Sequence, residues 1–325
     1  MKRIVSFDII RAVAIVGILL AHQFVTEGSL FLLELGRWLG STFSAVFLCL
    51  SALLLGRAWN GKGRPAYGWS FLLHRFSIIV IPYWLLLTVF LSLAYVTGNV
   101  FSLKNIAMNF ALLGWLAKIP GIGHFWFVTM ISFCYVAIVL ISWLLQADWG
   151  RRLFPWMLLL GCAVLYAWLA HFNLPAYMAV ILLYYGLIFV YADQILAGLQ
   201  RHGKHIIYVV VPILLLLIAG LFASGILAGE NNNLIVYGCS LCGIAILLLL
   251  QTIFDGTANC PRFVSAVSGI SYEWYLVHHP MIIGPLALTY VLPRPMAVAL
   301  YWLLSLCFAF VLHYLSSFVY KLFRA

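Results

Sequence analysis

Long apolar runs separated by short polar breaks are the dominant pattern of this chain. A helix needs roughly 17–25 consecutive apolar residues to cross the hydrocarbon core of a bilayer. Runs of this length predict about ten transmembrane helices and an all-α, polytopic integral membrane protein. The predicted spans are 5–24, 38–57, 76–97, 125–146, 153–171, 176–192, 206–228, 233–254, 265–289 and 296–319.

One apolar segment is too short to cross a bilayer. Residues 103–116, LKNIAMNFALLGWL, contain too few consecutive apolar positions and predict a re-entrant or interfacial segment. The chain shows no internal repeat and no soluble appendage. We therefore expect a single membrane-embedded domain over residues 1–325.

Composition supports an integral membrane protein, and membrane topology accounts for the net positive charge. The chain is 66% hydrophobic and only 8% charged, whereas soluble domains carry about 25% charged residues. A net charge of +10 would suggest nucleic acid in a soluble protein, but in a membrane protein it first reports topology. With the N-terminus inside, the bases on the inner side are Lys2, Arg3, Arg57, Lys62, Arg64, Arg75, Arg151, Arg152, Arg201, Lys204, Arg262, Lys321 and Arg324.

The opposite side holds few bases, which are Arg37, Lys104, Lys118 and Arg294. Because cytoplasmic loops are enriched in Lys and Arg, this asymmetry predicts that both termini lie in the cytoplasm. The bases are then a topology signal, and no nucleic-acid partner is expected.

Neither cysteines nor histidines form a recognisable metal motif. The chain has seven cysteines, and an odd number scattered through apolar spans predicts no disulfide framework. Cys239 and Cys242 form one C-x-x-C without a second pair, and we interpret them as packing residues. His202 and His205 lack further ligands for zinc. No metal site is expected.

The first span carries an unusual pair of side chains. Arg11 and His22 are separated by ten residues within FDIIRAVAIVGILLAHQF, so a helix places them on one face, roughly 16 Å apart along its axis. Ionisable groups within the hydrocarbon cost roughly 2.5–3.5 kcal/mol each on insertion scales, and they usually face a protein interior or a cavity. This face is therefore a candidate site.

Motifs in four segments resemble one known family. Phe7-Asp8 and Arg11-Ala12 are followed by His22 in the first span. Later segments are SAVFLCLS at 44–51, FLLHR at 71–75 leading to Pro82-Tyr83, and SGISYEWYLVHHP at 268–280. This set is similar to the membrane-bound acyltransferase family 3, whose members are O-acyltransferases of surface glycans.

The chain departs from that family at two places. Many members carry an Arg-x-x-Arg pair before the proline of the third span, but here only Arg75 is present, with Phe76 and Ile79 in the paired positions. Many members also carry an acid in the segment that begins the fourth span, where this chain has Ile131. Chemistry in this chain cannot depend on that acid.

The resemblance implies an enzyme of the plasma (inner) membrane. Acyl-CoA, with acetyl-CoA as the expected donor, would be the co-substrate, and a hydroxyl of a glycan or lipid-linked sugar at the outer face would be the acceptor. The topology fits this reaction, because Arg11 and Arg75 lie toward the cytoplasm and His22 and His278 toward the outer side. Cations at the inner mouth suit the phosphates of the coenzyme.

We therefore predict roles for individual residues. His22 and His278 are the candidate catalytic pair, with His22 as general base or as the site of an acyl-imidazole intermediate. Arg11, Arg75 and Asp8 are the candidate coenzyme-binding residues. A candidate substrate path contains His124, Trp126, Tyr272 and Glu273.

Each assignment has a purely structural alternative. Asp8 stands three residues before Arg11, a spacing that permits a simple ion pair, and Arg75 could serve only as a positive-inside anchor. Glu273 in the ninth span needs a buried base, either Arg11 or another. His124 and His279 could be packing residues, and His278 could equally be a packing or a functional residue. His171 and His313 are interpreted as interfacial residues.

A different class of function uses the same features. A transporter or flippase for a polar or glycan solute could employ the charged cavity, with His22 in proton coupling. Transporters often show inverted repeats and paired broken spans, and the sequence shows neither clearly.

Overall fold

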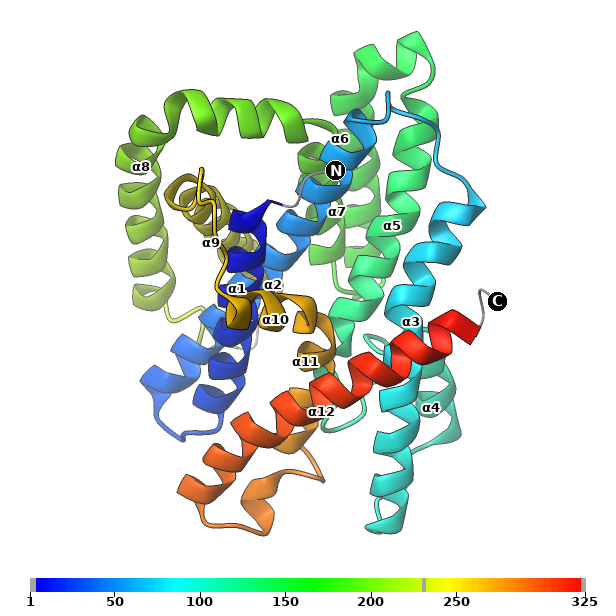
Figure 1. Ribbon diagram of the computed structural model, residues 1–325, viewed down its shortest axis with the longest axis vertical. Helices are drawn as coiled ribbons and strands as arrows, with labels where there is room; N and C mark the ends of the chain where they lie inside the picture. Colours follow the sequence, from blue (N-terminus) through cyan, green and yellow to red (C-terminus); the bar gives the residue numbers. More distant parts are fainter. Residues whose placement is uncertain (1–3, 230–231, 323–325) are drawn as a thin grey trace.

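The computed structural model describes residues 4–229 and 232–322, which form helices and no strands (Figure 1). The elements are α1 (Val5–Val25), α2 (Leu30–Asn60), α3 (Trp69–Val96), α4 (Leu103–Phe110), η1 (Gly123–Phe125), α5 (Trp126–Leu144), α6 (Asp148–His171), α7 (Tyr177–Val190), α8 (Ala192–Ala223), α9 (Asn232–Ile253), α10 (Arg262–Gly269), α11 (Ser271–His278), η2 (His279–Met281), η3 (Leu288–Tyr290) and α12 (Arg294–Leu322).

Helix length and hydropathy confirm the predicted class. In the described part of the chain, eight helices are long and apolar enough to cross a membrane, or nine if a bent pair counts as one span. The protein is therefore an all-α, polytopic integral membrane protein. The number of continuous spans is lower than the predicted ten, because two predicted spans are broken or bent.

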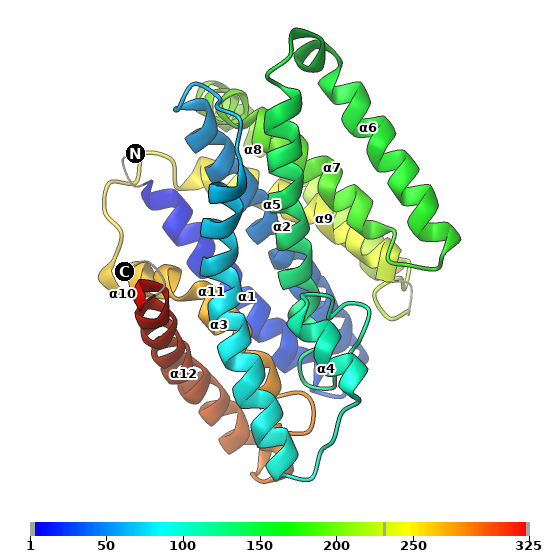
Figure 2. The same cartoon turned by 90° about the vertical axis from the view of Figure 1, so that its right-hand side faces the viewer.

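The central helices are α1, α2 and α5, and the outer ones are α6 and α8. Between 61% and 67% of the most apolar windows of the central three is buried, against 17% in α6 and 11% in the second half of α8. Figures 1 and 2 show α1 and α2 running antiparallel within the bundle, with α6 at its periphery. The polar groups of α1 therefore face protein.

Glycines allow the central helices to approach closely. A Cβ on Gly56 of α2 would lie 2.0 Å from the carbonyl oxygen of Phe189 in α7. A Cβ on Gly243 of α9 would lie 2.8 Å from the carbonyl oxygen of Thr42 in α2. Lipid is as apolar as the helix surfaces, so membrane helices associate through such close van der Waals packing.

The short segment at 103–116 does not form a span. It contains α4, of eight residues, followed by turns. Tyr83 of α3 donates a hydrogen bond to the carbonyl oxygen of Asn109 (2.7 Å), and Asn109 Nδ2 donates to the carbonyl oxygen of Ala117 (2.8 Å). These bonds satisfy backbone groups that helical pairing leaves open, and they hold the segment against α3.

The predicted spans at 176–192 and 206–228 have a different form. Residues 193–205 were expected to form a loop between these spans, but they are helical, because α8 already begins at Ala192. The first half of α8, Ala192–Gly203, is bent 72° from α7. Figure 1 shows this half lying across one end of the bundle before α8 turns along it. The first half buries Leu196 and Leu199 and exposes Gln200, an amphipathic pattern.

The predicted span at 265–289 is not one helix. It divides into α10, α11 and η2, with breaks at Ile270 and after His278. Pro280 lacks an amide hydrogen and ends the regular helix. Gly284 then adopts φ +96°, and a Cβ on it would lie 2.3 Å from the Cα of Gly121. The turn after α11 thus packs directly on the loop that precedes η1.

The Gly56 contact yields a stability prediction. Gly56→Ala places a methyl group against the backbone of α7, and overpacking of this kind costs about 1–3 kcal/mol. We expect a lower thermal unfolding midpoint in detergent. Gly161→Ala in α6 is the control, because a Cβ there meets nothing within 4 Å. Equal midpoints in the two variants would contradict the close contact between α2 and α7.

Candidate active site

Four histidines from distant parts of the chain meet near the C-terminal end of α1. His22 lies in the last turn of α1, His124 lies in η1, and His278 and His279 join α11 to η2. The ring of His22 lies 4.8 Å from that of His278 and 4.6 Å from that of His279, between centroids. His124 stacks on His279 at 4.4 Å. We call these residues the histidine cluster.

Backbone carbonyls set the tautomer of His278. Its Nδ1 lies 2.6 Å from the carbonyl oxygen of Tyr275 and 3.2 Å from that of Trp274. A carbonyl oxygen only accepts, so Nδ1 carries the hydrogen. In neutral His278 the other nitrogen, Nε2, is then an acceptor.

This acceptor orients His22. Nδ1 of His22 lies 3.1 Å from Nε2 of His278 and 3.0 Å from the carbonyl oxygen of Ile18. Both are acceptors, so Nδ1 of His22 donates. The lone pair of neutral His22 is consequently on Nε2, and the half-buried ring presents it as a base or nucleophile.

The other two histidines are also held by carbonyl oxygens. Nδ1 of His279 donates to Gly121 (2.7 Å), and Nε2 of His124 donates to Leu276 (3.1 Å). Tyr275 donates its hydroxyl hydrogen to the carbonyl oxygen of His124. Nδ1 of His124 is buried and has no hydrogen-bond partner. The cluster therefore offers several unprotonated nitrogens around His22.

A polar network surrounds Arg11, which lies about three turns before His22 in the same helix. Nη1 of Arg11 donates to Oγ of Ser268 (3.2 Å), and Ser268 donates to Oδ1 of Asp8 (2.9 Å). Nη1 also lies 3.7 Å from that carboxylate oxygen. The predicted Asp8–Arg11 ion pair thus forms, and Ser268 of α10 extends it across helices.

Arg11 also lines a cavity of about 560 Å³ together with Arg75. Arg75 stacks over Phe71 at 5.7 Å, and its Nε atom is buried without a hydrogen-bond partner. Tyr272 and Glu273 line the same space. We call it the arginine cavity, and its size is typical of small-molecule sites.

The carboxylate of Glu273 pairs with a histidine. Oε1 of Glu273 lies 2.9 Å from Nδ1 of His313 in α12. The partner of Glu273 is therefore a base other than Arg11, and His313, which was interpreted as interfacial, makes this contact with its side chain 39% exposed. Ile79 and Ile131, where the chain departs from many relatives, also line the arginine cavity.

Two aromatic rings, those of Phe127 and Tyr275, connect the arginine cavity with the histidine cluster. Phe127 lines the cavity, and its ring lies 5.0 Å from that of Tyr275. Tyr275 in turn contacts His124 at 5.2 Å and His278 at 5.7 Å. The ring of Tyr275 therefore separates Phe127, at the wall of the arginine cavity, from the histidine cluster.

Trp126 lines a different cavity, which also includes Gly123 of η1. This cavity has a volume of about 540 Å³ and is lined also by Trp115, Tyr177, Asn173 and Asn233. The rings of Trp126 and Tyr177 are 6.0 Å apart. We call it the aromatic cavity.

The structure thus divides the predicted site residues into three groups. His22, His278 and His124 meet in the histidine cluster, and Arg11, Arg75, Tyr272 and Glu273 line the arginine cavity, with Asp8 behind Arg11. Trp126 belongs to the aromatic cavity. Three residues without a predicted catalytic or binding role contact these groups. His279 lies in the histidine cluster, Ser268 bonds to Arg11, and His313 pairs with Glu273.

Within the described residues, no group of three or more His, Cys, Asp or Glu side chains has a geometry that could hold a metal ion. The histidine rings stack or meet edge to face, and their nitrogens bond to backbone carbonyls. Cys239 and Cys242 are free and buried in α9.

A known protein family matches most of the chain. A family model described as an acyltransferase domain matches residues 4–315, nearly the whole chain. The chain belongs to acyltransferase family 3. No curated protein and no solved structure shows significant similarity to it. The protein is therefore a membrane acyltransferase, and this acyltransferase uses an acyl donor and an acceptor.

The link through Ser268 makes a prediction about this acyltransferase. Ser268→Ala removes one donor and one acceptor between α1 and α10, leaving a buried carboxylate less satisfied at a cost of about 1–3 kcal/mol. We expect a lower unfolding midpoint and a lower transfer rate. Ser224→Ala at the end of α8 is the control, because its hydroxyl bonds only to nearby backbone groups, donating to Leu221 and accepting from Ile226. An unfolding midpoint equal to that of the control would refute the link.

Proposed function

We propose that this acyltransferase moves an acetyl group from cytoplasmic acyl-CoA to a hydroxyl of a glycan or lipid-linked sugar at the outer face. The observation that supports this most directly is the placement of Arg11 and His22 on one helix, one at the arginine cavity and the other in the histidine cluster. Acyl-CoA has the same polarity, with phosphates at one end and a thioester at the other.

The arginine cavity suits the anionic end of the donor. Arg11 and Arg75 supply guanidinium groups, and the buried Nε of Arg75 has no protein partner. Charge-assisted hydrogen bonds from guanidinium to phosphate are short and roughly twice as strong as neutral ones. A bound phosphate would satisfy this donor.

The length of α1 fits the arm of the coenzyme. Eleven helical steps separate Arg11 from His22 by roughly 16 Å along the axis, a distance that the extended arm can bridge. Phe127 stands between the arginine cavity and Tyr275. We propose that the arm passes this ring, so the thioester reaches the cluster while the phosphates stay with the arginines.

The tautomer of His22 suits base catalysis. Nε2 of His22 accepts the proton of the acceptor hydroxyl while the oxygen attacks the thioester carbonyl. The tetrahedral intermediate then collapses, the C–S bond breaks, and the proton passes to the departing thiolate to give CoA-SH and the ester. His278 holds His22 through Nδ1, which fixes the basic nitrogen and stabilises the charged ring that forms.

A two-step route through an acyl-imidazole uses the same nitrogen. Nε2 of His22 attacks the thioester, CoA-SH leaves, and the acceptor hydroxyl then takes the acyl group. Acid quenching with donor alone, followed by peptide mass spectrometry, separates the routes, because only this one leaves an acyl group on His22.

The aromatic cavity supports a carbohydrate acceptor. Apolar C–H faces of sugars pack on aromatic rings such as Trp126 and Tyr177, and amide groups such as Asn173 and Asn233 bond to hydroxyls. The cavity includes Gly123, the neighbour of His124 in η1. An acceptor there lies at the same end of the protein as the histidine cluster.

The uneven distribution of Lys and Arg and the directions of the helices support one orientation of the protein in the membrane. The helices run alternately along the bundle, and the ends of α2 and α5 lie at the same end as the start of α1 (Figure 1). We propose that this end is cytoplasmic, with both termini inside, that the protein resides in the inner membrane, and that one domain, 1–325, carries the activity. Membership of an acyltransferase family favours transfer over the transport alternative.

Replacing His22 tests the chemical role. We expect His22→Ala to slow transfer from labelled acetyl-CoA by about 10²–10⁴-fold, the usual contribution of general acid–base catalysis, while acetyl-CoA still binds. His171→Ala at the exposed end of α6 is the control. If His22→Ala transfers at the wild-type rate, the proposed role of His22 fails.

Replacing the arginines tests donor binding separately. We expect Arg75→Gln and Arg11→Gln to weaken acetyl-CoA binding about tenfold or more, since one charged hydrogen bond contributes about 1.5–3 kcal/mol. Arg152→Gln in the exposed part of α6 is the control, and isothermal titration of purified protein gives Kd. Unchanged Kd in both arginine variants would exclude the arginine cavity as the donor site.

A further inference from the structure

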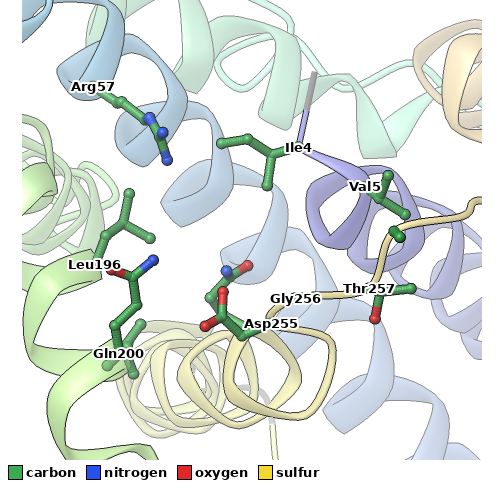
Figure 3. Close-up of a pocket in the computed structure, with 11 residues that line it drawn as sticks. Ile4, Val5, Arg57, Leu196, Gln200, Asp255, Gly256 and Thr257 are labelled. Atoms are coloured by element: carbon green, nitrogen blue, oxygen red, sulfur yellow. The ribbon is translucent and has the colours of Figure 1, made fainter. Parts of the chain in front are cut away.

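A second polar cavity shares no lining residue with the arginine cavity. It has a volume of about 540 Å³ and is lined from α2, α8, α9 and the start of α1. Leu54 and Ala58 of α2 line the arginine cavity, whereas Arg57 lines this one. The cavity is therefore separate from the donor site, and we call it the Arg57 cavity (Figure 3).

The charged side chains that line the Arg57 cavity do not form ion pairs with one another. Figure 3 shows Arg57, Gln200 and Asp255 directed toward the same space. Over the described ranges 4–229 and 232–322, neither Arg57 nor Asp255 has an ion pair. A ligand here would bring an anionic group for the guanidinium and a cationic group for the carboxylate.

A buried amide strengthens the case for a ligand. Gln251 lines the Arg57 cavity and is only 4% exposed, and its Oε1 has no hydrogen-bond partner. An unsatisfied buried acceptor costs about 1–3 kcal/mol. A ligand with N–H or O–H donors would remove this cost.

An apolar cavity of about 460 Å³ adjoins the Arg57 cavity. The two share Leu199 and Gln251 in their linings. The apolar one is lined by Leu53, Ile195 and Leu248, among other aliphatic side chains. The polar Arg57 cavity and the apolar cavity thus adjoin at Leu199 and Gln251.

The position of the cavities matches the lipid–water boundary. Both lie against the first half of α8, Ala192–Gly203, which buries Leu196 and Leu199 and exposes Gln200 and Arg201. A helix with one apolar and one charged face lies in the plane of the membrane interface. The Arg57 cavity is then at headgroup depth.

We infer that the paired cavities bind a zwitterionic phospholipid whose headgroup ends in a primary ammonium. The phosphate pairs with Arg57, the ammonium pairs with Asp255, and an acyl chain enters the apolar cavity. Oε1 of Gln251 accepts one of the N–H hydrogens. A lipid with a quaternary ammonium offers no N–H, and an anionic lipid offers no cation to Asp255.

Native mass spectrometry of delipidated full-length protein tests this inference. The probes are phosphatidylethanolamine, phosphatidylcholine and phosphatidylglycerol with identical oleoyl chains. We expect phosphatidylethanolamine to bind about tenfold more tightly than the other two, as one charge-assisted hydrogen bond suggests. Arg57→Gln should weaken all three lipids, and Asp255→Asn should abolish the preference for phosphatidylethanolamine.

A second variant tests the apolar cavity. Gly198 lines the apolar cavity, and a Cβ there meets nothing within 4 Å, so Gly198→Leu fills the cavity without striking backbone. We expect it to weaken lipid binding. Gly220→Leu is the matched control, because it is also in α8 and also in open space.

Two outcomes would overturn the inference. Equal binding of the three lipids, unchanged in Arg57→Gln and Gly198→Leu, would show that the paired cavities hold no lipid. Free O-phosphoethanolamine that competes as well as the lipid would show a headgroup site without a role for the chain. Acetyl-CoA affinity should not change in any of these variants, which separates this site from the proposed donor site.

Discussion

Two polar contacts join α1 to the broken segment α10–α11, and the site depends on both. At one end Ser268 bridges Asp8 and Arg11, and at the other His278 accepts a hydrogen from His22. Polar groups in a protein interior are costly unless they are partnered. Both contacts satisfy such groups, and together they fix the rotation of α1, so that its one polar face meets the arginine cavity and the histidine cluster.

Two adjacent histidines near the end of this segment contact His22. His278 and His279 both keep helical backbone angles, so their side chains diverge by about 100°. The ring of His22 contacts both, at 4.8 Å from that of His278 and 4.6 Å from that of His279. Backbone carbonyls hold each ring in one tautomer. The arrangement resembles a preorganised catalytic site, in which little reorientation is needed when a proton moves.

Local sequence patterns predicted the fold class and one face of the candidate site. The helix break and the partners of distant residues could not be predicted in this way. Apolar runs predicted the fold class, and helical periodicity placed Arg11 and His22 on one face. The break at Ile270 was missed although Ser268, Gly269 and Ser271 flank it, because such small residues also occur within continuous membrane helices. The pairing of Glu273 with His313 joins residues 40 positions apart, and no local pattern specifies such a partner.

The central claim is that the donor enters at one membrane face and reacts toward the other. Proteoliposomes with protein in a single orientation test it, with acetyl-CoA supplied to one face at a time and soluble oligosaccharides at the opposite face. We predict release of CoA-SH and labelled ester only when acetyl-CoA meets the face that bears the loop 61–68. Equal reaction from the face where α1 ends at Val25 would contradict the account.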